Sequence, residues 1–431
     1  MISKAKIVQI KPSSLVFIHA ANALTGPDLS PVEDLFLVVE DGRISRIESK
    51  KAEHIAAEVK NSPHYYSLHP GLTLMPCLAD AHIHLALKGK GLQSAQREQR
   101  IPGLIRTRLK DELAAMAAMG IGLVRDGGDL LSLNLAAKDM VENHSCSGPK
   151  VIATGEALRS SGGYGSFLGR SYLSRREIES RIETLSLSGV DQVKVVLSGI
   201  VSFSRYGVVE GPLMPLEDLV LIVNLAREMK LKVMAHASSE KAVILAIEAG
   251  VNSVEHGYFI SRDSLKKMAA KGITWVPTVI PVAAQVRSPL VEDKNPGEVE
   301  VIRRTYRKQL EKIVCAHEAG VTLGIGTDSG AQGVEHGRAL LDEILLYSEC
   351  GLPASAVLKS VTLNNAAILG CEKDAGSIEI GKKTYLIAVR GNPLENIGAV
   401  GSAELHFMPV MENSISHCAK ERTSNASCGC L

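Results

Sequence analysis

The chain has 431 residues, of which 45% are hydrophobic and 4% aromatic, and its formal net charge is +1. This length is too great for one small core and fits a barrel of typical size with a second module. The near-zero charge gives no general attraction to nucleic acid or acidic membranes, and no apolar run is long enough to span a bilayer. The first residues include Lys and Gln where a signal peptide needs an apolar core, so we expect a soluble, cytoplasmic protein. Whether it forms a homo-oligomer is left open.

Both flanks of the chain have a strand-like pattern. Residues 1–68 contain short alternating runs with a hairpin turn at Asp41-Gly42, and residues 373–411 are again turn-rich and strand-like. We therefore expect a small β-sandwich domain built from both ends of the chain, around a central domain of residues 69–372.

The last segment, residues 412–431, is predicted to be a polar tail. Its Cys428-Gly429-Cys430 sequence is compatible with a soft-metal or redox site, but a disordered chain end is the favoured interpretation. The five cysteines before the tail occur singly in apolar or loop contexts, which is typical of reduced thiols. They are Cys77, Cys146, Cys315, Cys350 and Cys371.

The central domain repeats one pattern, in which a helix-like stretch ends in Gly and a short apolar run follows. Gly just past a helix can adopt the left-handed conformation that closes the last turn, so the chain passes directly into a strand. The expected strands cover residues 72–76, 121–127, 150–157, 191–198, 231–236, 252–257, 274–279 and 322–328. The expected helices cover residues 102–119, 217–229, 239–249, 300–319, 337–349 and 354–369.

This alternation implies parallel strands joined by right-handed crossovers. Eight strands favour an α/β fold of the (β/α)8 TIM-barrel type over an open doubly wound sheet. No glycine-rich dinucleotide fingerprint follows the first strand, which also disfavours a Rossmann fold. The carboxyl ends of barrel strands meet at one mouth, where active sites are built.

Metal-binding residue types stand at these strand ends. His82 and His84 are two residues apart, so on a strand both imidazoles point to one side and can bind one ion. From the triplet alone, a hydrogen-bonded surface pair is the simpler interpretation. Its place at the end of a predicted barrel strand favours a metal site.

Four further residues add to the pattern. His236 and His256 end successive strands, although a lone His after an apolar run is more often a satisfied core residue. Lys194 lies inside an apolar run, where it is either half of a buried ion pair or a lysine carboxylated by carbon dioxide into an anionic metal bridge. Asp328 ends the last predicted strand and is flanked by glycines in GTDSG, so its carboxylate reaches the barrel mouth with little crowding. An Asp at a turn is often structural, but here a carboxylate is the one ligand that the group lacks.

With these residues, the chain resembles the amidohydrolase superfamily, and within it the imidazolonepropionase-related and Xaa-Pro dipeptidase-like branch. The resemblance covers residues 30–400 and is carried by several motifs in the family's order. They are DAHIHL, VKVVLSG, AHAS, VEHG, GTDSG, LNNAAILG and GSIEIGKKTYLIAVRGNPLENI.

The resemblance implies two divalent ions, most often Zn²⁺, with Mn²⁺ or Fe²⁺ as alternatives. His82 and His84 would bind the more buried ion, and carboxylated Lys194 would bridge the two. Asp328 would bind the first ion and act as the catalytic acid and base.

His236 and His256 would bind the more exposed ion of the pair. The implied reaction is attack of a metal-bound hydroxide on a substrate carbonyl polarised by that ion. The deaminase branch has Glu three residues after the strand-five His, where this chain has Ser239, with Glu240 one later. A one-residue shift on a helix turns a side chain by about 100 degrees, which argues against a deaminase.

The substrate side is less specific in sequence. The glycine-rich loop RSSGGYGSFLGR carries Tyr164, Arg159 and Arg170, which are candidates for a lid or a carboxylate clamp or are parts of an ordinary flexible loop. His336 is a candidate substrate contact or a structural residue at a helix start.

Three functions follow from this set. The preferred one is a binuclear hydrolase of a small amide, such as a dipeptide or an N-acyl amino acid. The second is a mononuclear, imidazolonepropionase-like enzyme that opens a cyclic amide with unmodified Lys194. The third is a catalytically silent assembly protein, which the intact ligand set disfavours.

Overall fold

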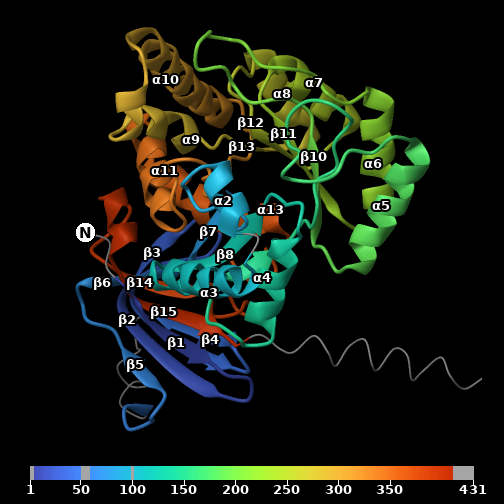
Figure 1. The fold of residues 1–431 in the computed structure, drawn as a ribbon. Coiled ribbons are helices and arrows are strands. Elements are labelled where there is room, and N and C mark those ends of the chain that lie inside the picture. The colour runs from blue at the N-terminus through green and yellow to red at the C-terminus, as the bar shows by residue number, and fades with distance from the viewer. Residues whose placement is uncertain (1–3, 50–58, 99–100, 411–431) are drawn as a thin grey trace, which may run out of the picture.

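The computed structural model describes residues 4–49, 59–98 and 101–410. They form a β-sheet module, in which strands from residues 6–76 and 386–409 lie together, and a larger α/β part (Figure 1). The predicted polar tail with its cysteines lies outside the described residues. The five earlier cysteines are all free, as expected.

The terminal module is one sheet of eight strands. β1 runs parallel to β15, while β14 pairs antiparallel with both β15 and β6, so the two ends of the chain are joined in one hydrogen-bonded sheet. Its strands are β1 (Lys6–Ile10), β2 (Leu15–Thr25), β3 (Ser30–Glu40), β4 (Arg43–Ser49), β5 (Tyr65–Ser67), β6 (Leu72–Pro76), β14 (Leu386–Arg390) and β15 (Ala403–Pro409).

One strand prediction is wrong. The run at 72–76, expected as the first barrel strand, is β6, which pairs with β14 and β2 in the terminal sheet. All five of its residues are buried, and a fully buried apolar run has no alternation that tells which sheet it joins. The first strand of the parallel series is β7, which begins two residues later at Leu78.

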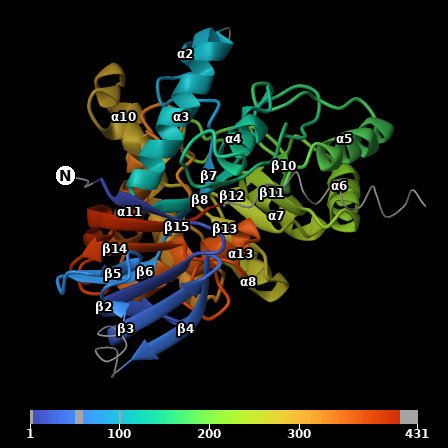
Figure 2. The same ribbon diagram turned by 90° about the horizontal axis from the view of Figure 1, so that it is seen from below.

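The α/β part contains two parallel sheets, ordered β7-β8-β9 and β10-β11-β12-β13. The strands within each sheet are parallel, and a parallel bridge between Leu158 and Val195 shows that the two sheets run in the same direction. Helices surround them (Figure 2). This is a TIM-barrel-like α/β fold. The strands are β7 (Leu78–Ile83), β8 (Ile121–Asp126), β9 (Lys150–Ile152), β10 (Gln192–Val196), β11 (Lys232–Ala237), β12 (Ser253–His256) and β13 (Thr274–Val276).

The predicted eighth strand, residues 322–328, is not a regular strand. It is joined to its neighbours by isolated bridges, Trp275 with Leu323 on one side and Ile83 with Ser329 on the other. A glycine in this segment lets its backbone lie close to β7. A Cβ at Gly326 would lie only 2.8 Å from the Cβ of His82.

Helices occupy all six stretches where the sequence predicts them, and the stretch at 354–369 is interrupted by a π-turn at Ser360–Asn364. Gly250 and Gly272 close their helices with positive φ, as the glycine pattern indicates. The helices are α2 (Leu92–Glu98), α3 (Pro102–Ala118), α4 (Leu133–Glu142), α5 (Arg175–Leu187), α6 (Leu216–Glu228), α7 (Glu240–Ala249), α8 (Arg262–Lys271), α9 (Ile280–Ala283), α10 (Pro296–Glu318), α11 (Arg338–Glu349), α12 (Ala354–Lys359) and α13 (Asn365–Leu369).

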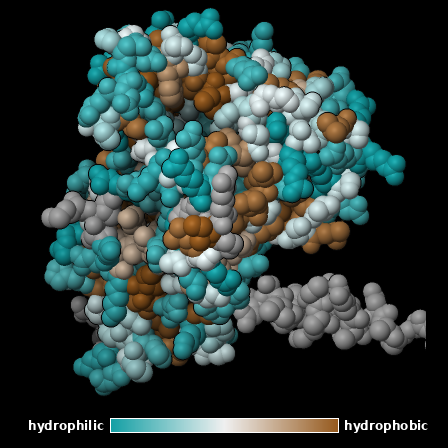
Figure 3. Space-filling model, in the orientation of Figure 1, coloured by the Kyte–Doolittle hydropathy of each residue, from teal (hydrophilic) through white to brown (hydrophobic). Residues whose placement is uncertain are grey.

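The surface is mixed in character. Most of the face in Figure 3 is hydrophilic and carries separate hydrophobic patches. In the described part of the chain, none of the helices combines the length and the apolar character that crossing a bilayer demands.

Candidate metal centre

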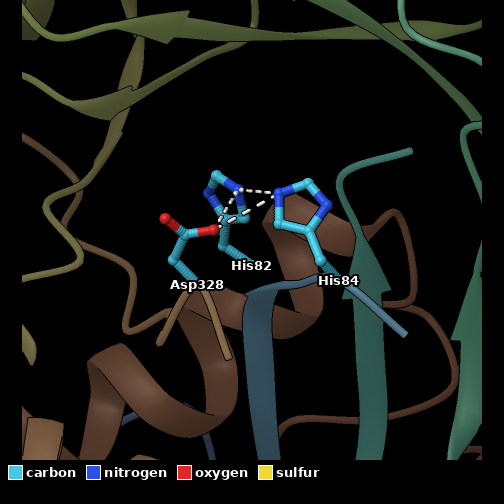
Figure 4. A group of neighbouring side chains, drawn as sticks. All are labelled: His82, His84 and Asp328. Atoms are coloured by element: carbon cyan, nitrogen blue, oxygen red, sulfur yellow. Dashed lines mark hydrogen bonds and ion pairs between the residues drawn. The ribbon is translucent and has the colours of Figure 1, made fainter. Parts of the chain in front are cut away.

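Three side chains meet at the carboxyl end of β7. His82 Nε2 lies 3.4 Å from His84 Nε2, and Asp328 Oδ1 lies 3.6 Å and 3.3 Å from those two nitrogens (Figure 4). One ligand atom from each residue falls within 4.8 Å of the others. Two imidazole nitrogens and a carboxylate oxygen at such separations suit a divalent transition-metal ion.

The other predicted ligands surround this group. Lys194 Nζ lies 3.4 Å from His82 Nε2. The ring of His256 has its centroid 5.1 Å from that of His82 and 4.4 Å from that of His236. The structure thus gathers all six predicted residues into one cluster. They come from β7 and the residue after it, from β10, β11 and β12, and from the segment after residue 322.

Hydrogen bonds at Nδ1 orient the imidazoles of His82 and His84. His84 Nδ1 lies 3.1 Å from Gly128 O, and a carbonyl oxygen only accepts, so Nδ1 carries the hydrogen. His82 Nδ1 lies 3.0 Å from Glu255 Oε2. Both rings therefore turn Nε2 toward the cluster.

The imidazoles of β11 and β12 differ from each other. His256 Nδ1 lies 2.6 Å from Thr278 Oγ1, and Thr278 donates its own hydrogen to the Pro277 carbonyl. Nδ1 of His256 is therefore the donor, and Nε2 is left for a metal. In His236 it is Nε2 that lies 3.2 Å from the Gly199 carbonyl, so Nδ1 is the nitrogen left to bind.

The backbone at the cluster adopts unusual conformations. Three residues have a positive φ, in the left-handed region that residues other than glycine rarely adopt. They are His256 (70°), Thr278 (51°) and Asp328 (51°). Such strain is typical of functional sites, where surrounding contacts hold it. Space is equally tight, because a Cβ at Gly127 would lie 2.6 Å from His84 Cε1.

Burial sets the electrostatics. Desolvation lowers the pKa of Lys194 to about 8 and that of His236 to about 3. Desolvation also lowers the pKa of His82 and of His256, whereas in His84 Asp328 outweighs desolvation and the pKa rises. Three imidazoles are thus kept neutral, as metal ligands must be, and the Lys194 amine loses its proton more readily than an exposed lysine.

Aromatic rings form the wall beside the cluster. Tyr164 stacks on His236 with centroids 5.3 Å apart, and Tyr258 stacks on His256 at 5.9 Å. Tyr258 is 5% exposed, and burial raises the pKa of both phenols. Of the predicted substrate contacts, Tyr164 is therefore the one placed against the centre.

The other predicted substrate contacts are engaged elsewhere. Arg159 donates to the carbonyls of Gly169 and Gly162 within its own loop. Arg170 lies 3.6 Å from Glu156 in an ion pair, with its side chain 70% exposed. Neither arrangement is that of a carboxylate clamp at the centre.

His336 also has a structural position. Its Nδ1 lies 2.8 Å from Ser329 Oγ and its Nε2 lies 3.1 Å from the Leu87 carbonyl. Both nitrogens thus tie together loops at the mouth. Glu240 stands one residue after the position where deaminases have Glu. Its carboxylate accepts hydrogen bonds from Ser261 N and Ser264 Oγ, at the start of the neighbouring helix α8.

Two buried charged residues at the centre are not among the predicted site residues. Glu255 contacts His82, and Arg125 NH2 donates to Glu255 Oε1 at 2.9 Å. Both residues are 0% exposed. The signal for Arg125 was available, since a charged residue inside the apolar run IGLVRD needs a buried partner.

The amidohydrolase family matches residues 73–413. Among curated proteins, an uncharacterised protein of Mycobacterium tuberculosis is 30% identical over 151 residues, which are 34% of this chain and 40% of that protein. Ochratoxinase of Aspergillus niger is 24% identical over 224 residues, which are 51% of this chain and 45% of the enzyme. The match thus spans less than half the length of these relatives.

Solved structures match over more of the chain. The structure of A. niger ochratoxinase has a TM-score of 0.77 and 21% identity, covering 91% of this chain and 93% of that one. A Xaa-Pro dipeptidase with bound methionine in its active site has a TM-score of 0.74 and 23% identity, covering 90% and 97%. At these identities the likeness establishes the fold.

Proposed function

Because the chain belongs to the amidohydrolase family, we propose that it is a metal-dependent hydrolase that cleaves a carbon–nitrogen bond in a small substrate. The observation that carries the proposal is the cluster itself, in which four imidazoles, one buried amine and one carboxylate meet at the strand ends. No residue set of this kind is needed to stabilise a barrel, whose interior is usually filled by branched apolar side chains.

The residues suit a divalent ion. His82, His84 and Asp328 would hold the first ion, and His236 and His256 the second. Lys194 would bridge them after its amine reacts with carbon dioxide, a step that the lowered pKa of Lys194 favours. When bound, such ions polarise a carbonyl and make water a nucleophile at neutral pH.

The chain's own groups supply the remaining chemistry. Asp328 accepts the proton that the attacking water loses and returns it to the leaving nitrogen. Asp328 has a left-handed backbone conformation, and its Oδ1 lies 3.6 Å and 3.3 Å from Nε2 of His82 and His84. Tyr164 and Tyr258 shield His236 and His256 from water.

We propose a dipeptide or an N-acyl amino acid as the substrate. The aromatic wall favours an apolar group beside the scissile bond. The dipeptidase and ochratoxinase among the similar structures agree with a small substrate of this kind. Arg159 and Arg170 are bonded elsewhere, so a substrate carboxylate would need another partner.

A second candidate is a mononuclear hydrolase that opens a cyclic amide. It is favoured by the group His82, His84 and Asp328, which can by itself hold one ion. In this case Lys194 stays an amine.

The test is a substrate panel with the full chain loaded with Zn²⁺ or Mn²⁺. Dipeptides, N-acyl amino acids and lactams are assayed before and after chelation. Hydrolysis of the open-chain amides, lost with chelation and restored by metal, supports the first function. Turnover of the lactams alone supports the second. Metal-loaded protein that turns over none of the three classes contradicts both.

We also propose a closed eight-stranded barrel, with a β-sandwich arrangement of the terminal module. The isolated bridges at Leu158, Leu323 and Ser329 link the two parallel sheets on both sides and support closure. The domain limits proposed from sequence, with a barrel in residues 69–372, then shift to place β6 in the terminal module.

A further inference from the structure

A buried charged network lies directly beneath the metal centre. Arg125 donates from Nε to the Ala81 carbonyl at 2.7 Å and from NH1 to Gln192 Oε1 at 3.1 Å. It also donates from NH2 to Glu255 Oε1 at 2.9 Å, and Glu255 Oε2 lies 3.0 Å from His82 Nδ1. Arg125, Glu255 and His82 are each 0% exposed.

This network joins the two parallel sheets through the interior. Arg125 and His82 belong to the sheet of β7 and β8, whereas Gln192 and Glu255 belong to the sheet of β10 and β12. Ser253 Oγ adds a hydrogen bond to Glu255 Oε1 at 2.6 Å, so that oxygen is fully engaged. The second carboxylate oxygen is left to His82.

The backbone explains why both Glu255 and His256 reach the interior. Successive residues of a strand normally point to opposite faces. His256, however, has φ of 70°, which turns its ring toward His82, with 5.1 Å between centroids. Glu255 also contacts His82, so two neighbouring residues act on one imidazole.

We propose that Glu255, held by Arg125, is a positioning residue that fixes the ring and tautomer of His82 and thereby sets the affinity of the centre for its first metal ion. The inference rests on the proposed function. Glu255 Oε2 accepts the Nδ1 hydrogen of His82, which leaves the Nε2 lone pair aimed at His84 and Asp328.

A purely structural role is the alternative, because a buried ion pair also holds sheets together. The two roles differ in what Glu255→Gln does. Glutamine has one acceptor oxygen, for which Arg125, Ser253 and His82 Nδ1 compete. If that oxygen stays with Arg125, the amide group faces His82 and favours the tautomer with hydrogen on Nε2, which blocks the metal.

The experiment measures Zn²⁺ affinity of the metal-free full chain by competition with a chelator, with thermal unfolding as the check of folding. For Glu255→Gln we expect affinity for the first ion to fall about 10- to 100-fold. The visible spectrum of bound Co²⁺ should change as well. Glu240→Gln is the matched control, since Glu240 also bridges two elements through two hydrogen bonds but contacts no proposed ligand. Its affinity should stay within about twofold of the wild type.

Glu255→Asp covers the case in which the glutamine variant does not fold. Aspartate keeps the charge beside Arg125 but lacks the reach to His82, so weaker binding with retained folding is expected. Wild-type affinity in a folded Glu255 variant overturns the inference and leaves the proposed function standing. A wild-type chain that binds no ion overturns both.

Discussion

The metal centre and the core of the terminal sheet are both buried, but they are filled in opposite ways. The sheet core is an apolar cluster that includes Ile18, Leu37, Leu74 and Phe407. The centre instead buries imidazoles, a lysine and the Arg125–Glu255 pair. Apolar burial stabilises a fold, whereas buried polar groups repay their desolvation only through specific partners. We therefore expect function and stability to be carried by separate regions.

The strongest test of this separation is Asp328→Asn. We expect kcat to fall by about 10²- to 10⁴-fold, the usual contribution of a positioned acid or base. Stability should change by less than about 1 kcal/mol, because Asn tolerates left-handed φ and the side chain is partly exposed. Steady-state kinetics and denaturant unfolding measure the two effects. A folded variant with wild-type kcat would remove Asp328 from the mechanism.

Phe407→Ala tests the other region. Phe407 is 0% exposed and packs edge-on against Tyr66, with centroids 5.4 Å apart. The cavity should cost about 3–5 kcal/mol of unfolding free energy, while kcat per folded molecule stays unchanged. A large loss of kcat at full folding would show that the terminal sheet shapes the centre.

His406 joins the terminal sheet to helix α3, and its substitution is expected to give the smallest effect. Its Nδ1 lies 2.7 Å from the Ala117 carbonyl of α3, and burial lowers its pKa to about 4. The unfolded chain takes up this proton below about pH 6.5 and the native chain only near pH 4. The histidine therefore contributes stability above pH 6.5 that is lost as the pH falls toward 4, up to about 3 kcal/mol at 1.36 kcal/mol per pKa unit.

His406→Asn keeps an amide donor for Ala117 but cannot titrate. The variant should lose less stability than the wild type between pH 7 and pH 4.5, as measured by denaturant unfolding at each pH. Equal losses would mean that His406 is protonated in the native state or does not titrate there.

Much of the centre could be predicted because polar residues at the ends of apolar strands are conspicuous. His82, Lys194 and Asp328 stand out in this way. The role of Glu255 could not be predicted in this way. Neighbouring side chains of a strand point to opposite faces, so a His256 that points inward implies a Glu255 that points outward. The positive φ of His256 lets both side chains reach the interior.

Elsewhere, the place of a strand or a side chain depended on tertiary packing, which the pattern of apolar and polar residues does not encode. The buried run at 72–76 suits two different sheets, and it joins the terminal one. Arg159 and Arg170 were plausible clamps by charge, but their partners are set by the fold of the glycine-rich loop. The positions of site residues could therefore be predicted where they stand at strand ends, and not where the conformation of a loop sets their contacts.

The most direct test of the central claim is the metal content of purified Lys194→Ala, measured beside the wild type and Lys232→Ala. Lys232 is a strand lysine of the same sheet, bonded to the Ala367 carbonyl away from the centre. The account predicts about two ions per chain in the wild type and in Lys232→Ala. It predicts clearly fewer in Lys194→Ala. Equal metal content in all three proteins, or none in the wild type, would contradict it.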